Sequence, residues 1–175
     1  MSFSLYEATI PTYLQILGSV SVLVDKAEAW CRDQNTAESD LIQASLAPDM
    51  LPFAYQISSC YWHSAGAIQG VRAGVFSPDS NPPPTDFSGL KAKLGAAIAE
   101  LQSLTRDEVN GLIGQAMRFE VKDFKLPFAA EDFLLSFSQP NFYFHATTAY
   151  DILRWKGLAI GKMDFIGALR MQTQG

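Results

Sequence analysis

The chain is poor in the residues from which disulfides and metal sites are built. It has two cysteines and two histidines among 175 residues. Cys31 and Cys60 are too few for a disulfide framework and lack CxxC spacing, so we expect buried, reduced thiols. The two histidines, His63 and His145, stand far apart in the sequence, and no HxxxH, ExxH or HExxH pattern occurs. The usual helical metal-binding motifs are therefore excluded.

Motifs for group transfer are also missing. The sequence contains no glycine-rich phosphate loop and no GxSxG turn, so phosphoryl and acyl transfer have no recognisable motif. The nearest approach to a nucleophilic pair is Cys60 with His63 three residues later, which would share a face of one helix.

Positive charge is scarce and scattered. Thirteen basic residues against eighteen acidic ones give a formal net charge of -5, which disfavours nucleic acid and anionic membrane surfaces as partners. The apolar run Tyr13 to Val24 resembles a secretory signal, but no basic residue precedes Lys26, and charges or prolines interrupt every longer apolar stretch. We expect a cytoplasmic protein with no membrane-spanning segment.

Apolar and aromatic residues are plentiful. The hydrophobic fraction is 48%, with twelve Phe, six Tyr and three Trp, which is enough for a core without disulfides or a structural metal. Neither composition nor charge divides the chain, so we expect one domain over residues 1–175.

Helical periodicity dominates the chain. Apolar residues recur every three to four positions in four long segments, with a shorter one between the first two. Pro11 is expected to kink the first helix or mark the end of its first turn, and Pro140 to kink the last. The long segments are 4–33, 51–71, 87–104 and 129–156, and the short one is 37–45.

The remaining segments are not long helices. Residues 77–84 hold four prolines and predict an irregular loop, whereas alternation over 116–128 predicts a small hairpin. A terminal segment, 163–170, is expected to dock through Phe165, Ile166 and Leu169. The sequence therefore predicts an all-α fold, a four-helix bundle with a small β-hairpin before the last long helix.

His145 is the first candidate for a functional side chain. It shares the inward stripe of the last helix with Asn141, so its imidazole is expected to face the interior. A hydrogen-bonded core histidine, a metal ligand and an acid–base group all remain open. His63 lies on the flank of the second helix with Gln56 and Cys60, where a surface or interface histidine is the simplest interpretation.

Three consecutive aromatic residues, Phe142, Tyr143 and Phe144, precede His145. They cover nearly the whole circumference of a helix, so some must face a neighbouring helix and others a second contact surface. This excess of aromatic surface predicts a homodimer.

Several longer motifs carry a family resemblance. They are APDMLP (47–52), QPNFYFH (139–145), TAYDILR (148–154) and GKMDFIG (161–167). With them the chain resembles a bacterial family of unknown function within the DinB/YfiT-like metalloenzyme superfamily. The resemblance implies a four-helix bundle, often dimeric.

The resemblance also implies a divalent metal bound by three histidines, one from the second helix and an HxxxH pair from the last. His145 matches the first member of that pair. The second member falls at Ala149, which has no donor atom, and the second-helix position falls near Gln56 or His63. This chain therefore departs from the metal-binding pattern.

Three functions remain open at this point. The first is binding of a small ligand in an inter-helix pocket formed by His145, Asn141, Gln56, Cys60 and His63, with no cofactor expected. The second is a divalent-metal hydrolase or thiol transferase with a rearranged zinc or nickel site built from His63, His145 and water. The third is a non-catalytic structural or partner-binding dimer.

Overall fold

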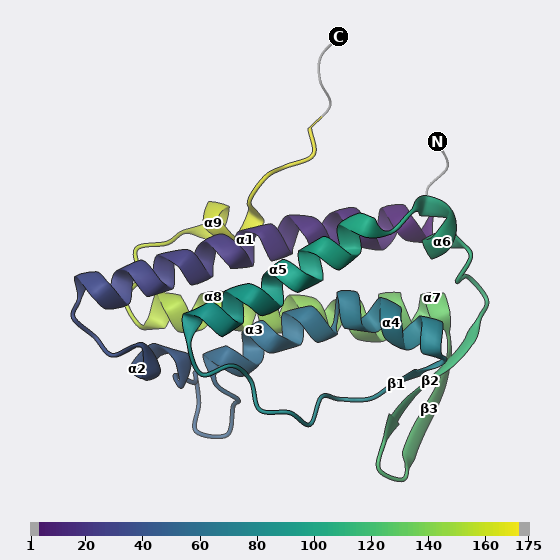
Figure 1. Cartoon of the computed structure of the whole chain (residues 1–175), viewed down its shortest axis with the longest axis horizontal. Coiled ribbons are helices and arrows are strands. Elements are labelled where there is room, and N and C mark those ends of the chain that lie inside the picture. The colour runs from purple at the N-terminus through teal and green to yellow at the C-terminus, as the bar shows by residue number, and fades with distance from the viewer. Residues whose placement is uncertain (1–3, 172–175) are drawn as a thin grey trace.

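Long helices in two layers make up most of the fold, which we describe over residues 4–171 in a computed structural model of the chain. One layer consists of α1 (Leu5–Asp33) and α5 (Phe87–Ser103), and the other of α3 (Phe53–Trp62), α4 (Ala65–Ala73) and α8 (Gln139–Trp155) (Figure 1). The closest helix pairings are α1 with α5 and α3 with α8, while α1–α8 and α3–α5 contacts join the layers.

The first helix agrees with its prediction. The Ser4 side chain caps α1 by accepting a hydrogen bond from the Glu7 N–H, and the helix continues through Pro11 to Asp33. Its inward stripe includes Tyr13, Leu17 and Val24, all fully buried. The predicted 87–104 helix is also confirmed as α5, whose cap is Asp86.

The predicted single helix over 51–71 is wrong. It is broken into α3 and α4 at His63 and Ser64, where the Ser64 hydroxyl donates to the Cys60 carbonyl oxygen at 2.5 Å. Beyond the break, Gly66 packs so closely on Trp62 that a Cβ would lie 2.8 Å from the indole ring, so this contact requires glycine. Apolar periodicity runs across the break and conceals it.

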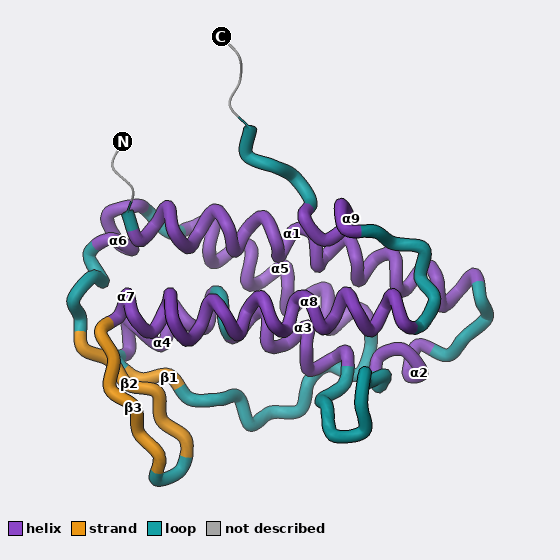
Figure 2. Tube along the Cα trace, turned by 180° about the vertical axis from the view of Figure 1, so that it is seen from behind, coloured by secondary structure: helices purple, strands orange, loops and turns teal. Residues whose placement is uncertain are grey.

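The predicted hairpin is present. Strands β2 (Ala116–Val121) and β3 (Phe124–Ala129) pair antiparallel, and the turn places Lys122 at φ 52. A third strand that the sequence analysis missed, β1 (Val75–Phe76), pairs parallel with β2 through Val75 and Arg118. Figure 2 shows this sheet at one end of the helices, beside α4 and α7.

The predicted last helix, 129–156, is interrupted before Pro140 rather than at it. It begins as α7 (Ala130–Asp132), continues as a π-helical segment, η1 (Phe133–Ser138), and then becomes α8. Pro140 follows η1 within continuous helical backbone, since Ser138 and Gln139 both have helical dihedral angles, so the irregular segment directly precedes the residue that has no N–H to donate. The Asn141 side-chain amide donates to the Phe137 carbonyl oxygen at 2.7 Å within this region.

Short helices complete the chain. They are α2 (Glu38–Ile42), α6 (Arg106–Asn110) and α9 (Lys162–Ile166). In the predicted terminal docking segment, Phe165 packs edge-on against Tyr150, but Leu169 is 55% exposed, so its predicted docking is wrong. The structure is therefore mostly helical with a small three-stranded sheet. Within residues 4–171, no helix is long and apolar enough to cross a membrane.

Candidate functional site

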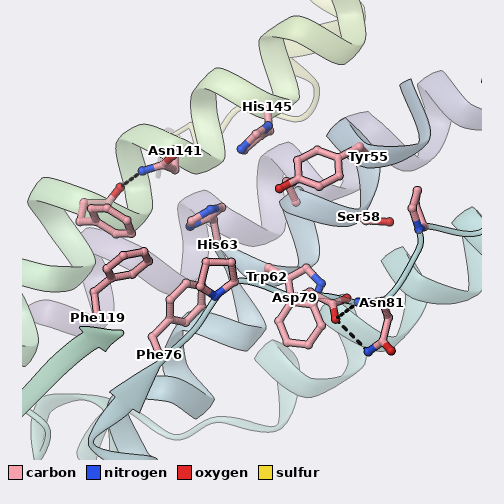
Figure 3. Close-up of a pocket in the computed structure, with 14 residues that line it drawn as sticks. Tyr55, Ser58, Trp62, His63, Phe76, Asp79, Asn81, Phe119, Asn141 and His145 are labelled. Atoms are coloured by element: carbon pink, nitrogen blue, oxygen red, sulfur yellow. Dashed lines mark hydrogen bonds between the residues drawn. The ribbon is translucent and has the colours of Figure 1, made fainter. Parts of the chain in front are cut away.

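A cavity of about 200 Å³ opens where α3, the loop after β1, the hairpin, η1 and α8 meet (Figure 3). Its wall combines aromatic and polar side chains with two prolines, and the polar groups stand at two ends. The aromatic lining residues are Tyr55, Trp62, Phe76, Phe119 and Phe137, and the polar ones are Ser58, Ser59, His63, Asp79, Asn81, Asn141 and His145.

The break after α3 gives His63 its position. As the C-cap residue that follows α3, it directs its ring between Phe76 and Phe137, with ring centroids 5.6 and 6.1 Å away. The Ser138 hydroxyl donates to the His63 carbonyl oxygen at 3.1 Å and lies 3.4 Å from Nδ1 of the imidazole. The ring lines the cavity, so the interpretation of His63 as a surface histidine is wrong.

His145 reaches the same cavity from α8. Its Nδ1 lies 2.7 Å from the side-chain oxygen of Gln56, which is buried. The Gln56 amide nitrogen donates in turn to the Leu51 carbonyl oxygen at 2.8 Å. This chain of contacts fixes the orientation of the His145 ring, because Gln56 is held from both ends.

The two imidazoles face each other. Their rings stack with centroids 5.6 Å apart and planes 14° from parallel. Burial lowers the pKa of His145 to about 4, and burial together with the neighbouring His145 charge lowers the pKa of His63 to about 3. Both rings are therefore neutral at pH 7.

The other polar end of the cavity has an unused hydrogen-bonding group. Among the residues that the structure describes, the Ser58 hydroxyl is buried without a hydrogen-bond partner, whereas the buried Trp62 indole N–H is near enough to the Asp79 carboxylate to lower its pKa. The nearby Asp79 carboxylate accepts bonds from the Asn81 backbone and side-chain amides at 3.0 and 2.9 Å and lies 3.6 Å from the Lys93 ammonium. Burial raises the pKa of Asp79, but these partners outweigh it and lower the pKa overall.

The structure brings three of the five proposed site residues together in the cavity wall: His63, Asn141 and His145. Gln56 and Cys60 lie outside the wall. Gln56 acts on the site through its contact with His145. The Cys60 thiol is fully buried and donates to the Gln56 backbone carbonyl at 3.3 Å, and burial raises its pKa to about 12. A neutral thiol in this position does not serve as a nucleophile at pH 7.

Sequence reasoning missed Ser58, Trp62 and Asp79. Ser58 and Trp62 lie on the same helix as Gln56 and Cys60, and a Trp–His pair at the end of an apolar stripe was a usable signal. Asp79 lies in the loop predicted to be irregular, and no periodicity indicates which way such a loop folds.

Comparison with known families gives a match to nearly the whole chain. Residues 5–166 match the family described as "Domain of unknown function (DUF1993)". The chain belongs to this family. Its structure is similar to that of a DinB family member protein from Shewanella denitrificans, with a TM-score of 0.82, 22% identity and coverage of 97% of this chain and 96% of that one. This likeness shows the fold, and the predicted resemblance to a DinB-like family of unknown function is confirmed. No curated protein matches the chain.

The donor groups of this DUF1993 member do not fit the three-histidine metal site that the DinB resemblance implies. No group of three His, Cys, Asp or Glu side chains suited to a metal occurs within residues 4–171. Position 149 is alanine, so the second histidine of the HxxxH pair is missing. The site's chemistry is therefore derived from its own side chains.

Proposed function

We propose that this chain is a single-domain helical bundle that binds a small planar molecule in the cavity between His145 and Trp62. The observation that carries the proposal is a buried hydroxyl without a partner, Ser58 Oγ, in the wall of a cavity that five aromatic side chains also line. Leaving such a group unpaired costs about 1–3 kcal/mol, and a ligand that pairs with it recovers that cost.

The lining supports a planar, largely apolar ligand. Aromatic side chains from α3, β1, β2 and η1 surround the cavity, and Phe76, Phe119 and Phe137 also pack on one another with ring centroids 5.0 to 6.4 Å apart. A wall of packed rings is stiff and offers flat faces for stacking. The cavity of about 200 Å³ suits a molecule of one or two rings.

The test uses two probes of the same two-ring shape, indole and benzothiophene, with thermal melting and calorimetry as readouts. We expect both to raise the melting temperature and to bind in a one-to-one ratio. Ser58→Leu fills the cavity and is expected to abolish binding, whereas the matched control Ser88→Leu, on an exposed face of α5, retains it. No binding of either probe to the wild type at about 1 mM would contradict the proposal.

The same experiment tests the divalent-metal alternative. Two neutral imidazoles favour that alternative because neutral imidazole is a zinc and nickel ligand. We expect calorimetric titration with zinc or nickel to give no one-to-one complex. A stoichiometric complex lost in His145→Ala would instead support a metal-dependent hydrolase or thiol transferase with a rearranged ligand set.

A homodimer is a separate part of the proposal. On α8, Phe142 is fully buried, but Tyr143 and Phe144 are 37% and 56% exposed, which supports the expected second contact surface. Sedimentation velocity of the wild type and of Phe144→Ser tests it. A wild-type monomer at about 100 μM would exclude the dimer in favour of isolated exposed aromatics.

A further inference from the structure

We infer that the ligand is an uncharged molecule with a hydrogen-bond-donor edge, held by the Nε2 atoms of His63 and His145. This inference rests on the proposed small-molecule function and specifies the chemistry of what binds. It follows from the hydrogen-bond partners behind the two rings.

The tautomer of His145 is fixed by Gln56. The Gln56 amide nitrogen donates to the Leu51 carbonyl oxygen, so the atom that faces His145 is the amide oxygen, which only accepts. At 2.7 Å from that oxygen, Nδ1 of His145 must carry the proton. In a neutral ring, Nε2 is then left with a lone pair.

The same argument applies to His63. The Ser138 hydroxyl has one proton and donates it to the His63 carbonyl oxygen at 3.1 Å. Its oxygen is therefore free to accept from His63 Nδ1, which lies 3.4 Å away. His63 thus takes the same tautomer as His145, and its Nε2 also becomes an acceptor.

These acceptors face the cavity. Both histidines line it, whereas Gln56, which holds the Nδ1 edge of His145, lies outside the lining. Figure 3 shows the His145 ring extending from α8 toward His63, with Asn141 on the same side of the cavity. Because the Asn141 amide nitrogen is engaged by the Phe137 carbonyl oxygen, its side-chain oxygen adds a third acceptor at this end.

The charges around the cavity favour an uncharged ligand. Both imidazoles are neutral at pH 7, because burial lowers the pKa of each, so this end has no positive charge for an anion. At the other end the Asp79 carboxylate is engaged by Asn81 and Lys93, which reduces its attraction for a cation. A neutral donor such as a heterocyclic N–H matches what remains.

The first experiment measures the tautomers without any ligand. The chain has two histidines, so nitrogen-15 spectra of the imidazoles contain two sets of signals. At pH 7 we expect the proton on Nδ1 in both rings, the less common form of a free imidazole. In Gln56→Leu, His145 should change to the Nε2–H form, while the exposed-site control Gln102→Leu leaves it unchanged. Nε2–H in both wild-type rings would overturn the inference.

The second experiment compares probes with and without a donor. Indole carries an N–H, benzothiophene does not, and benzamidine is a cation of similar size at pH 7. We expect indole to bind about tenfold more tightly than the other two probes. This preference should disappear in Gln56→Leu. The melting temperature of the variant is recorded to check that it folds. Equal binding of indole and benzothiophene would overturn the inference but leave the proposed function standing. Preference for benzamidine would also overturn it.

Discussion

The two closest helix pairs differ in what they bury. Between α1 and α5 the buried side chains are almost entirely apolar, and the exceptions on α1, Thr9 and Ser19, donate to their own helix at the Leu5 and Gln15 carbonyls. The side of the molecule around α3 and α8 holds the other buried polar residues, which are Gln56, Ser58, Ser59, Ser64, Ser138 and Thr148.

This difference separates stability from function within one fold. Apolar side chains make up nearly all that α1 and α5 bury, and apolar packing has no specificity for a ligand. Buried polar groups on the α3–α8 side reduce stability unless each finds a partner, and Ser58 has none. The α3–α8 side therefore carries a group that folding alone does not explain.

The largest expected effect comes from opening a void on the apolar side. Leu94 of α5 is fully buried, and Leu94→Ala should lower the free energy of unfolding by about 2–5 kcal/mol. Denaturant unfolding measures this loss. If stability and ligand binding reside in different helix pairs, the folded variant keeps the indole affinity of the wild type. A loss of indole binding in parallel with the loss of stability would contradict this separation.

Acid should destabilise the α3–α8 side first. The folded-state pKa values of His63 and His145, about 3 and about 4, lie below the unfolded value of 6.5, so below that value the unfolded chain binds more protons. The contribution of the two neutral histidines to the free energy of unfolding is fully present above pH 6.5. It falls as the pH drops, by on the order of 2 kcal/mol per histidine between pH 7 and pH 5.

Unfolding in urea at pH 7, 6 and 5 checks this dependence, since most carboxylates remain ionised in that range. The His145→Gln variant should lose less stability than the wild type over the same interval. An identical pH dependence in the two proteins would show that His145 is not held neutral.

A smaller effect, of opposite sign, is expected at Ser58. Its hydroxyl is buried without a partner, so Ser58→Ala removes an unsatisfied group and should stabilise the free protein by about 0.5–1 kcal/mol. The melting temperatures of Ser58→Ala and the wild type, without and with indole, test this stabilisation. Destabilisation of the free protein would mean that the hydroxyl has a partner in solution.

The smallest effect is expected for a surface ion pair that joins α1 and α5. Lys91 lies 2.7 Å from Asp25 and 2.9 Å from Glu28, with its side chain 34% exposed. Lys91→Met should change the free energy of unfolding by about 0–1 kcal/mol, and less at high salt. A salt series of unfolding curves measures it. A larger loss would show that charge, as well as apolar packing, holds this pair together.

Periodicity predicted the parts of the fold that local sequence controls. The first and third long helices and the hairpin were found because their apolar residues repeat without interruption. The break at Ser64 was missed because apolar residues keep their helical spacing across it, and nothing in that spacing marks the non-helical backbone of Ser64, φ -123 and ψ -91. Strand β1 was missed because two residues carry no pattern, and their partner in β2 is about forty positions away.

The site was predictable in its histidines but not in their arrangement. His145 and Asn141 could be assigned to the inner face of α8 from spacing alone. His63 reaches the same cavity because α3 ends there. Gln56 becomes the hydrogen-bond partner of His145 because α3 and α8 pack side by side. Such pairings depend on tertiary contacts, which a single sequence does not display.

The π-helical segment η1 sets the aromatic wall of the cavity through its length. A π turn holds one more residue than an α turn, so removing one residue from Phe133–Ser138 would let the helix close in the ordinary α geometry. A full turn covers 360° in either geometry, so α7 and α8 would keep their directions. The change would be confined to η1 itself, which contributes Phe137 to the cavity wall. Among relatives of this chain, a one-residue gap at this point therefore marks proteins expected to place a different side chain in this part of the wall.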